Sequence, residues 1–77
     1  MTKRLPSLKA REVMRALERA GFLHVRSKGS HRVFQHCDHP GRRTIIADHG
    51  GRDVPRGTLR AIIEQAGLTV EEFIDLL

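Results

Sequence analysis

The sequence predicts a two-layer α+β domain in which helices cover one face of a three-stranded antiparallel sheet. Two segments with helical apolar spacing, residues 8–20 and 56–66, enclose three short apolar segments. The connections between those short segments favour hairpins and an antiparallel meander over parallel crossovers. With 77 residues, the chain is expected to form one domain over residues 1–77.

The first helix is expected from about Leu8 to Ala20. Ser7 is a suitable N-cap, and Gly21 stands where a left-handed residue commonly ends a helix. The side of this helix that faces the core is expected to consist of Ala10, Val13, Met14 and Leu17.

Three strands are expected over residues 22–27, 31–36 and 43–47, with a turn at Lys28-Gly29 and a loop around Pro40-Gly41. Each strand contains two adjacent apolar residues, which point to opposite faces of a sheet. These pairs are Phe22-Leu23, Val33-Phe34 and Ile45-Ile46. One face therefore packs on the helices. We interpret the other as a candidate protein-binding surface, with local twist or cover by loops as the alternative.

A polar, glycine-rich connection over residues 48–53 leads to a second helix over residues 56–66. Pro55 suits its first turn, and Gly67 ends it. Its inward side is expected to consist of Leu59, Ile62, Ile63 and Ala66. Thr69 and Glu72 have the spacing of a capping box, which predicts a last short helix.

Charge is distributed unevenly along the chain. All 14 Lys and Arg lie within residues 1–60, whereas the charged residues of segment 61–77 are all acidic. The basic segment 1–60 indicates a polyanionic partner, and nucleic acid is the first candidate. The alternative is that the charge only makes this protein soluble and basic. No apolar run approaches the roughly 18–20 residues of a membrane span. The basic residues are scattered over several elements and do not form the polar face of one apolar helix, so no membrane partner is expected. The single cysteine, Cys37, excludes an intramolecular disulfide and fits a reducing cytoplasm.

The most distinctive motif is Gly29-Ser30-His31, which has a cation on each side, Lys28 and Arg32. An imidazole exchanges protons near neutral pH, and glycine adopts backbone conformations closed to residues with a Cβ. The Ser30 hydroxyl can hold a ring nitrogen or a phosphate oxygen. The motif predicts a small acid–base site directed at a phosphodiester. The alternative is a hairpin turn followed by a surface histidine.

Four segments carry a family resemblance, and they are residues 17–22, 28–31, 45–49 and 57–68. In this order they resemble the HicA toxin family, the endoribonuclease half of bacterial HicA–HicB toxin–antitoxin modules. The resemblance implies a double-stranded-RNA-binding-like fold, mRNA cleavage, a HicB-like antitoxin as partner and His31 as the catalytic histidine. Members often carry proline, one residue and then histidine after the third strand. Here Ala47 stands in place of that proline, before Asp48 and His49.

We therefore expect metal-independent RNA cleavage in which His31 acts as base or acid. Gly29, Ser30 and His49 are the candidate supporting residues. Contacts to RNA phosphates are expected from Lys28, Arg32, Arg11, Arg15, Arg56 and Arg60. The alternatives are a non-catalytic module that binds structured RNA and, last, an assembly subunit.

His36-Cys37-Asp38-His39 brings together three usual kinds of metal ligand. The spacing is tight, however, and no second cysteine or histidine pair completes a zinc ligand set. No metal site and no cofactor are therefore expected. The three phenylalanines, Phe22, Phe34 and Phe73, are expected in the core rather than on RNA bases.

Overall fold

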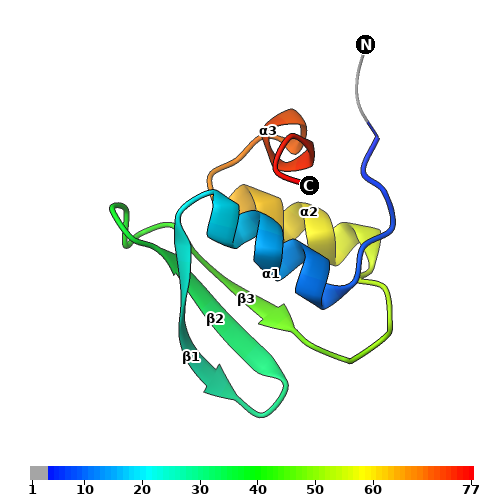
Figure 1. Cartoon of the computed structure of the whole chain (residues 1–77), viewed down its shortest axis with the longest axis horizontal. Coiled ribbons are helices and arrows are strands. Elements are labelled where there is room, and N and C mark those ends of the chain that lie inside the picture. The colour runs from blue at the N-terminus through cyan, green and yellow to red at the C-terminus, as the bar shows by residue number, and fades with distance from the viewer. Residues whose placement is uncertain (1–3) are drawn as a thin grey trace.

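A computed structural model describes residues 4–77, so the first three residues of the expected domain lie outside the described part. The elements are α1 (Ala10–Arg19), β1 (Phe22–Lys28), β2 (His31–His36), β3 (Arg43–Ala47), α2 (Arg56–Gln65) and α3 (Val70–Ile74). The strands form one antiparallel sheet in the order β1-β2-β3. Both long helices lie on one face of it, and the turn end of the β1–β2 hairpin projects beyond them (Figure 1). The predicted α+β fold is confirmed.

The start of α1 differs from the prediction. Ser7 does not cap this helix; Lys9 is the N-cap, and the helix begins at Ala10. The reason is a tertiary contact, because the Leu8 carbonyl accepts the Val54 backbone N–H at 2.7 Å and residue 9 pairs with residue 53 as an isolated bridge. These contacts hold residues 8 and 9 extended. Glu12 then accepts the Lys9 backbone N–H at 2.9 Å.

The first hairpin also differs slightly from expectation. β1 continues one residue further, to Lys28, and the turn residues are Gly29 and Ser30. Gly29 has φ +59°, a backbone conformation that favours glycine. The predicted bounds of β2 and β3 agree with the structure.

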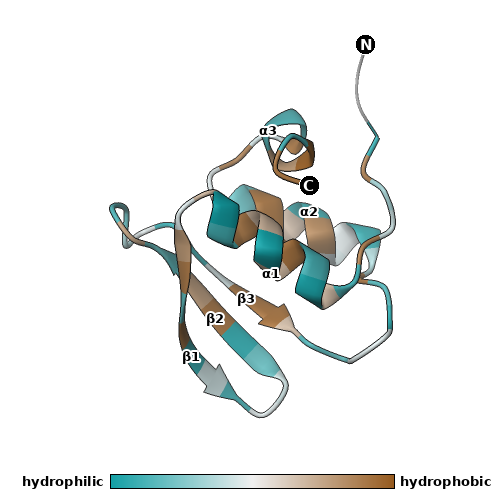
Figure 2. Cartoon of the chain, viewed as in Figure 1, coloured by the Kyte–Doolittle hydropathy of each residue, from teal (hydrophilic) through white to brown (hydrophobic). Residues whose placement is uncertain are grey.

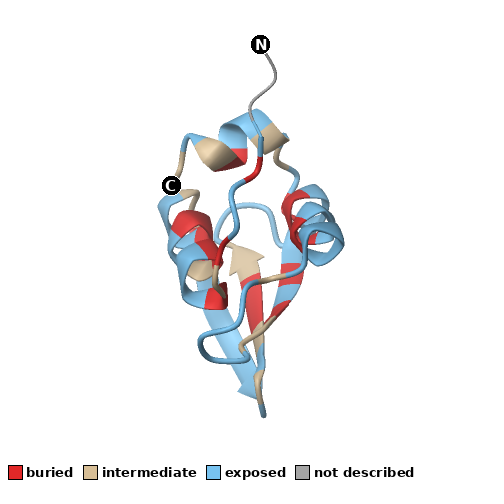
Figure 3. Cartoon of the chain, turned by 90° about the vertical axis from the view of Figure 1, so that its right-hand side faces the viewer, coloured by how far each residue is buried: buried red, intermediate tan, exposed pale blue. Residues whose placement is uncertain are grey.

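The core lies between the helices and the sheet, where the buried segments in Figure 3 face one another. All three phenylalanines are at most 2% exposed. Of the expected inward residues of α1 and α2, Met14 is partly buried and packs against the core. The others are buried: Ala10, Val13, Leu17, Leu59, Ile62, Ile63 and Ala66.

The C-terminal elements follow the predicted signals closely. Gly67 has φ +74° and ends α2, while Pro55 is its N-cap rather than a first-turn residue. Thr69 and Glu72 form the expected capping box, with Thr69 N–H donating to the Glu72 carboxylate at 2.8 Å and Glu72 N–H donating to the Thr69 hydroxyl at 3.1 Å. Across residues 4–77, no helix is both long and apolar enough to cross a bilayer.

Candidate active site on the first hairpin

The His31 side chain lies on the sheet face that points away from the helices. His31 opens β2 and pairs with Lys28 of β1 and with Ala47 of β3, and cross-strand partners share a face. Phe34, three residues later, is buried against the helices and therefore marks the opposite face. His31 is exposed. We call the face that carries it the outer face.

A β-bulge in β1 places two cations on this outer face. The register shifts between His24, which pairs with Phe34, and Arg26, which pairs with Val33. Strict alternation from the buried Phe22 would have directed Arg26 and Lys28 towards the helices. The extra residue reverses this alternation, as bulges do. Arg26 is thus a candidate phosphate-binding residue that sequence reasoning missed, because no residue type near position 25 predicts a bulge there.

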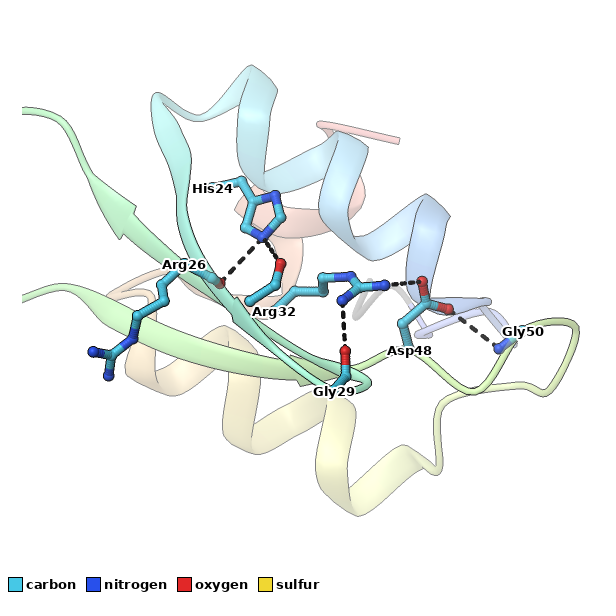
Figure 4. A network of polar contacts seen from close by, with 7 residues as sticks. His24, Arg26, Gly29, Arg32, Asp48 and Gly50 are labelled. Atoms are coloured by element: carbon cyan, nitrogen blue, oxygen red, sulfur yellow. Dashed lines mark hydrogen bonds and ion pairs between the residues drawn. The ribbon is translucent and has the colours of Figure 1, made fainter.

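The Gly-Ser-His turn is fixed by contacts with Arg32 of β2 and with the segment that follows β3 (Figure 4). The Gly29 carbonyl accepts a hydrogen bond from Arg32 Nη1 at 2.8 Å, and the Ser30 carbonyl accepts the Asp48 backbone N–H at 2.7 Å. Arg32 Nη2 lies 3.8 Å from Asp48 Oδ2. The Asp48 carboxylate also accepts the Gly50 N–H at 3.2 Å. The position of the His31 backbone is therefore set by two loops at once.

The two cations that flank the motif in sequence have different surroundings. Lys28 lies opposite His31 on the outer face, whereas Arg32 pairs with Ser27 and Ile46 on the face towards the helices. Arg32 is half-buried and engaged with Gly29 and Asp48. Lys28 is thus available to a ligand at His31, and Arg32 positions the turn.

A second histidine on the inner side of the hairpin also escaped sequence reasoning. His24 stacks on Phe34 with ring centroids 5.1 Å apart, and its Nε2 lies 2.7 Å from the Ser27 hydroxyl and 3.1 Å from the Arg26 carbonyl (Figure 4). The His24 ring therefore makes contacts within the hairpin, next to the bulge.

The remaining basic residues proposed from the sequence lie on the helix layer. Arg11 and Arg15 are exposed on α1, and Arg56 and Arg60 are exposed on α2. Arg56 donates to the Leu5 carbonyl at 3.0 Å. Both helices pack on the face opposite His31, so the fold does not gather these four residues around the imidazole.

His49 lies beyond the end of β3, in the connection to α2. It is exposed and lines a cavity of about 250 Å³ together with Ala47, the residue paired with His31. The cavity lies between the end of β3, residues 48–55 and the first turns of α2. His49 and His31 are therefore brought to the same end of the sheet.

Three of the four candidate metal ligands at the other end of β2 come together. One ligand atom each from His36, Cys37 and Asp38 lies within 4.8 Å of the others, and the His39 ring is 5.0 Å from the His36 ring. His36 Nδ1 accepts the Asp38 backbone N–H at 3.1 Å, which uses one of its two ring nitrogens. The absence of a metal site stays a prediction.

Apolar side chains cover the middle of the outer face. Leu23, Val25 and Ile45 are 57%, 51% and 54% exposed. Val33 lies between Arg26 and Ile45 and is 6% exposed, yet it is not part of the core between helices and sheet. Figure 2 shows this hydrophobic middle of the strands beside the hydrophilic turn end of the hairpin. The exposed apolar face expected from the sequence is present.

The geometry defines a class of protein, a small α+β domain with an exposed histidine among cations on an open sheet face. The model of the family described as the HicA toxin of bacterial toxin–antitoxin systems matches residues 10–68. This chain belongs to the HicA toxin family, and such a toxin has an antitoxin as its partner. No curated protein matches the chain.

Proposed function

We propose that this toxin is a metal-independent endoribonuclease that cleaves mRNA through His31 and is inhibited by a HicB-like antitoxin. The observation that carries the proposal is the exposed His31 imidazole on the outer face, with Lys28 directly across from it and Arg26 on the same face. A histidine beside two cations has the parts needed to move a proton next to a bound phosphate.

The reaction requires two proton transfers around one phosphorus atom. The 2′-hydroxyl loses its proton to a base, and its oxygen forms a bond to phosphorus. The bond from phosphorus to the 5′-oxygen breaks, and the leaving oxygen takes a proton from an acid. The products are a 2′,3′-cyclic phosphate and a 5′-hydroxyl end. His31 supplies one of these transfers, a contribution worth about 10²–10⁴-fold in rate.

Lys28 and Arg26 are the cations that we assign to the reacting phosphate, because they share the face of His31. Gly29 and Ser30 support the imidazole by forming the turn before it, and Arg32 holds that turn. Arg11, Arg15, Arg56 and Arg60 lie on the helix layer and would bind more distant phosphates of the RNA. His49 is the candidate for the second proton transfer, with water or a lysine as the alternatives.

The antitoxin is proposed to cover the outer face. That face combines exposed apolar side chains with the cations around His31, so a complementary partner presents an acidic and partly apolar surface. Seated there, the antitoxin would block access of RNA to the imidazole.

The test is RNA cleavage by purified wild type, His31→Ala and His31→Gln. His39→Ala is the matched control, because His39 is an exposed histidine in the β2–β3 loop at the far end of β2. We expect wild type and His39→Ala to cut single-stranded RNA in the presence of EDTA, leaving 5′-hydroxyl ends, and both His31 variants to be inactive while folded.

The same assay separates the alternative function. Binding of intact duplex RNA without cleavage would support a non-catalytic RNA-binding module. Cleavage by folded His31→Ala at the wild-type rate would remove His31 from the mechanism, and dependence on added metal would contradict the proposed chemistry.

A further inference from the structure

The cavity at the end of β3 has a composition suited to a flat, partly polar ligand. Its floor is aliphatic, with Ile46 and Ile62 almost fully buried and Val54 half-buried. Its rim carries hydrogen-bonding groups from Arg52, Asp53 and Thr58, in addition to His49. Ligand sites generally combine apolar walls with a few polar groups that fix orientation.

The size of the cavity limits the ligand. Pockets for drug-sized molecules span about 300–1,000 Å³, and this one holds about 250 Å³. A single ring system fits such a space better than a whole nucleotide or a peptide segment. Nucleobases have apolar faces and polar edges, and proteins that read single-stranded RNA bind unstacked bases by those edges.

The cavity is also tied to the proposed catalytic residue. Ala47 lines it and is the cross-strand partner of His31, and the Cα atoms of such partners lie about 4.5–5.5 Å apart. The bond between the Asp48 N–H and the Ser30 carbonyl fixes the loop that continues from Ala47 to the turn that holds His31. The cavity, on the helix side of the sheet, and the imidazole, on the outer face, therefore flank the same end of β3.

We propose that this cavity binds one nucleobase of the RNA, that of a nucleotide next to the phosphodiester held at His31. This inference rests on the proposed function and extends it, because it assigns base selection at the cut to the cavity. The guanidinium of Arg52 and the imidazole of His49 favour the electronegative edge of a base and its adjoining phosphate.

The first experiment measures binding directly. The ¹⁵N-labelled full chain is titrated with each of the four nucleoside 5′-monophosphates, and backbone amide shifts are followed by NMR. We expect shifts at residues 47–58 that differ between the four bases, and no shifts in the β2–β3 loop around Gly41. Equal small shifts for all four, or shifts confined to Arg26 and Lys28, would mean binding of phosphate alone and would overturn the proposal.

The second experiment measures base choice during cleavage. Thr58→Leu adds volume at the rim of the cavity and removes a hydroxyl, whereas Ala61→Leu adds an exposed leucine elsewhere on α2. Cut sites in a random RNA library are sequenced for both variants and for wild type. We expect Thr58→Leu to lower the base preference beside the cut about tenfold or more, and Ala61→Leu to keep it.

The outcomes separate this inference from the proposed function. Cleavage by wild type without base preference, or with a preference unchanged in Thr58→Leu, overturns the base pocket and leaves the ribonuclease intact. If wild type does not cleave RNA, the proposed function fails. The NMR titration by itself then decides whether the cavity binds a nucleobase. Should Thr58→Leu not fold, Thr58→Ala, which removes only the hydroxyl and a methyl group, replaces it in the cleavage assay.

Discussion

Arg32 and Asp48 connect the β1–β2 turn to the segment after β3, with Nη2 of the guanidinium 3.8 Å from Oδ2 of the carboxylate. The same guanidinium donates to the Gly29 carbonyl at 2.8 Å, so one side chain holds both sides of the proposed active site. Both side chains are about 30% exposed, which keeps part of the pair out of water. The position of His31 therefore depends on a residue of the opposite face.

Arg32→Ala is expected to destabilise the fold by about 1–2 kcal/mol, because it removes a charge-assisted hydrogen bond and a half-buried ion pair. Cleavage should fall as well, since the turn before His31 loses its anchor. Chemical denaturation and RNA cleavage measure the two effects. Asp48→Asn, which retains an oxygen for the Gly50 N–H, should cost less. An Arg32→Ala protein with full activity and stability would contradict the positioning role.

Gly29→Ala tests the strain of the turn by itself. A Cβ at this position meets nothing within 4 Å, so the penalty comes from the backbone at φ +59° and is expected at about 1–2 kcal/mol. Gly41→Ala is the control, because that position is also open and has no positive φ. Equal melting temperatures for the two variants would show that the turn has another conformation.

Phe73→Ala tests how α3 is attached. Phe73 is fully buried in the core, and removing a buried phenyl ring costs about 3–5 kcal/mol. For a domain of 77 residues this is a large part of the total stability. Leu77→Ala, at a residue 44% exposed, should stay within about 0.5 kcal/mol of wild type in the same denaturation experiment.

The capping box of α3 predicts a pH effect. The Thr69 backbone N–H, followed by its side chain and, more weakly, the Arg42 guanidinium, lowers the pKa of Glu72 below its usual 4.5. The folded pKa lies below the unfolded one, so this stabilisation is present above about pH 4.5 and is lost as the pH falls through the folded pKa. Glu72→Gln should remove that part of the acid sensitivity in melts between pH 3 and 6. Glu71→Gln, in the same first turn, should retain it.

Salt dependence tests which cations hold RNA. Binding that relies on phosphate contacts weakens with salt, and removing one cation that binds a phosphate reduces the slope of log K against log salt by about 0.7 for single strands. Lys28→Gln should reduce both this slope and the cleavage rate, because Lys28 lies across from His31. Arg60→Gln, on the helix layer, should reduce the slope and keep the rate at saturating RNA. A rate loss in both variants would place the reacting phosphate elsewhere.

Local signals predicted most of the elements because they are properties of short segments. Gly67 and the Thr69–Glu72 pair ended and began helices as expected. The N-terminus of α1 could not be found in this way, since Leu8 and Lys9 are held extended by partners more than 40 residues away. The side chains of Ser7 and Lys9 do not encode those contacts.

By itself, the sequence determined the order of elements, the apolar sides of α1 and α2 and the turn that precedes His31, because each depends on periodicity or on glycine. Only the tertiary structure decided which cations share a face with the imidazole. The bulge after His24 turns Arg26 and Lys28 to the side of His31, whereas Arg32, the residue after His31 in β2, points to the other face by strand alternation. Cross-strand register, and not distance along the chain, sets the neighbours of a side chain in a sheet.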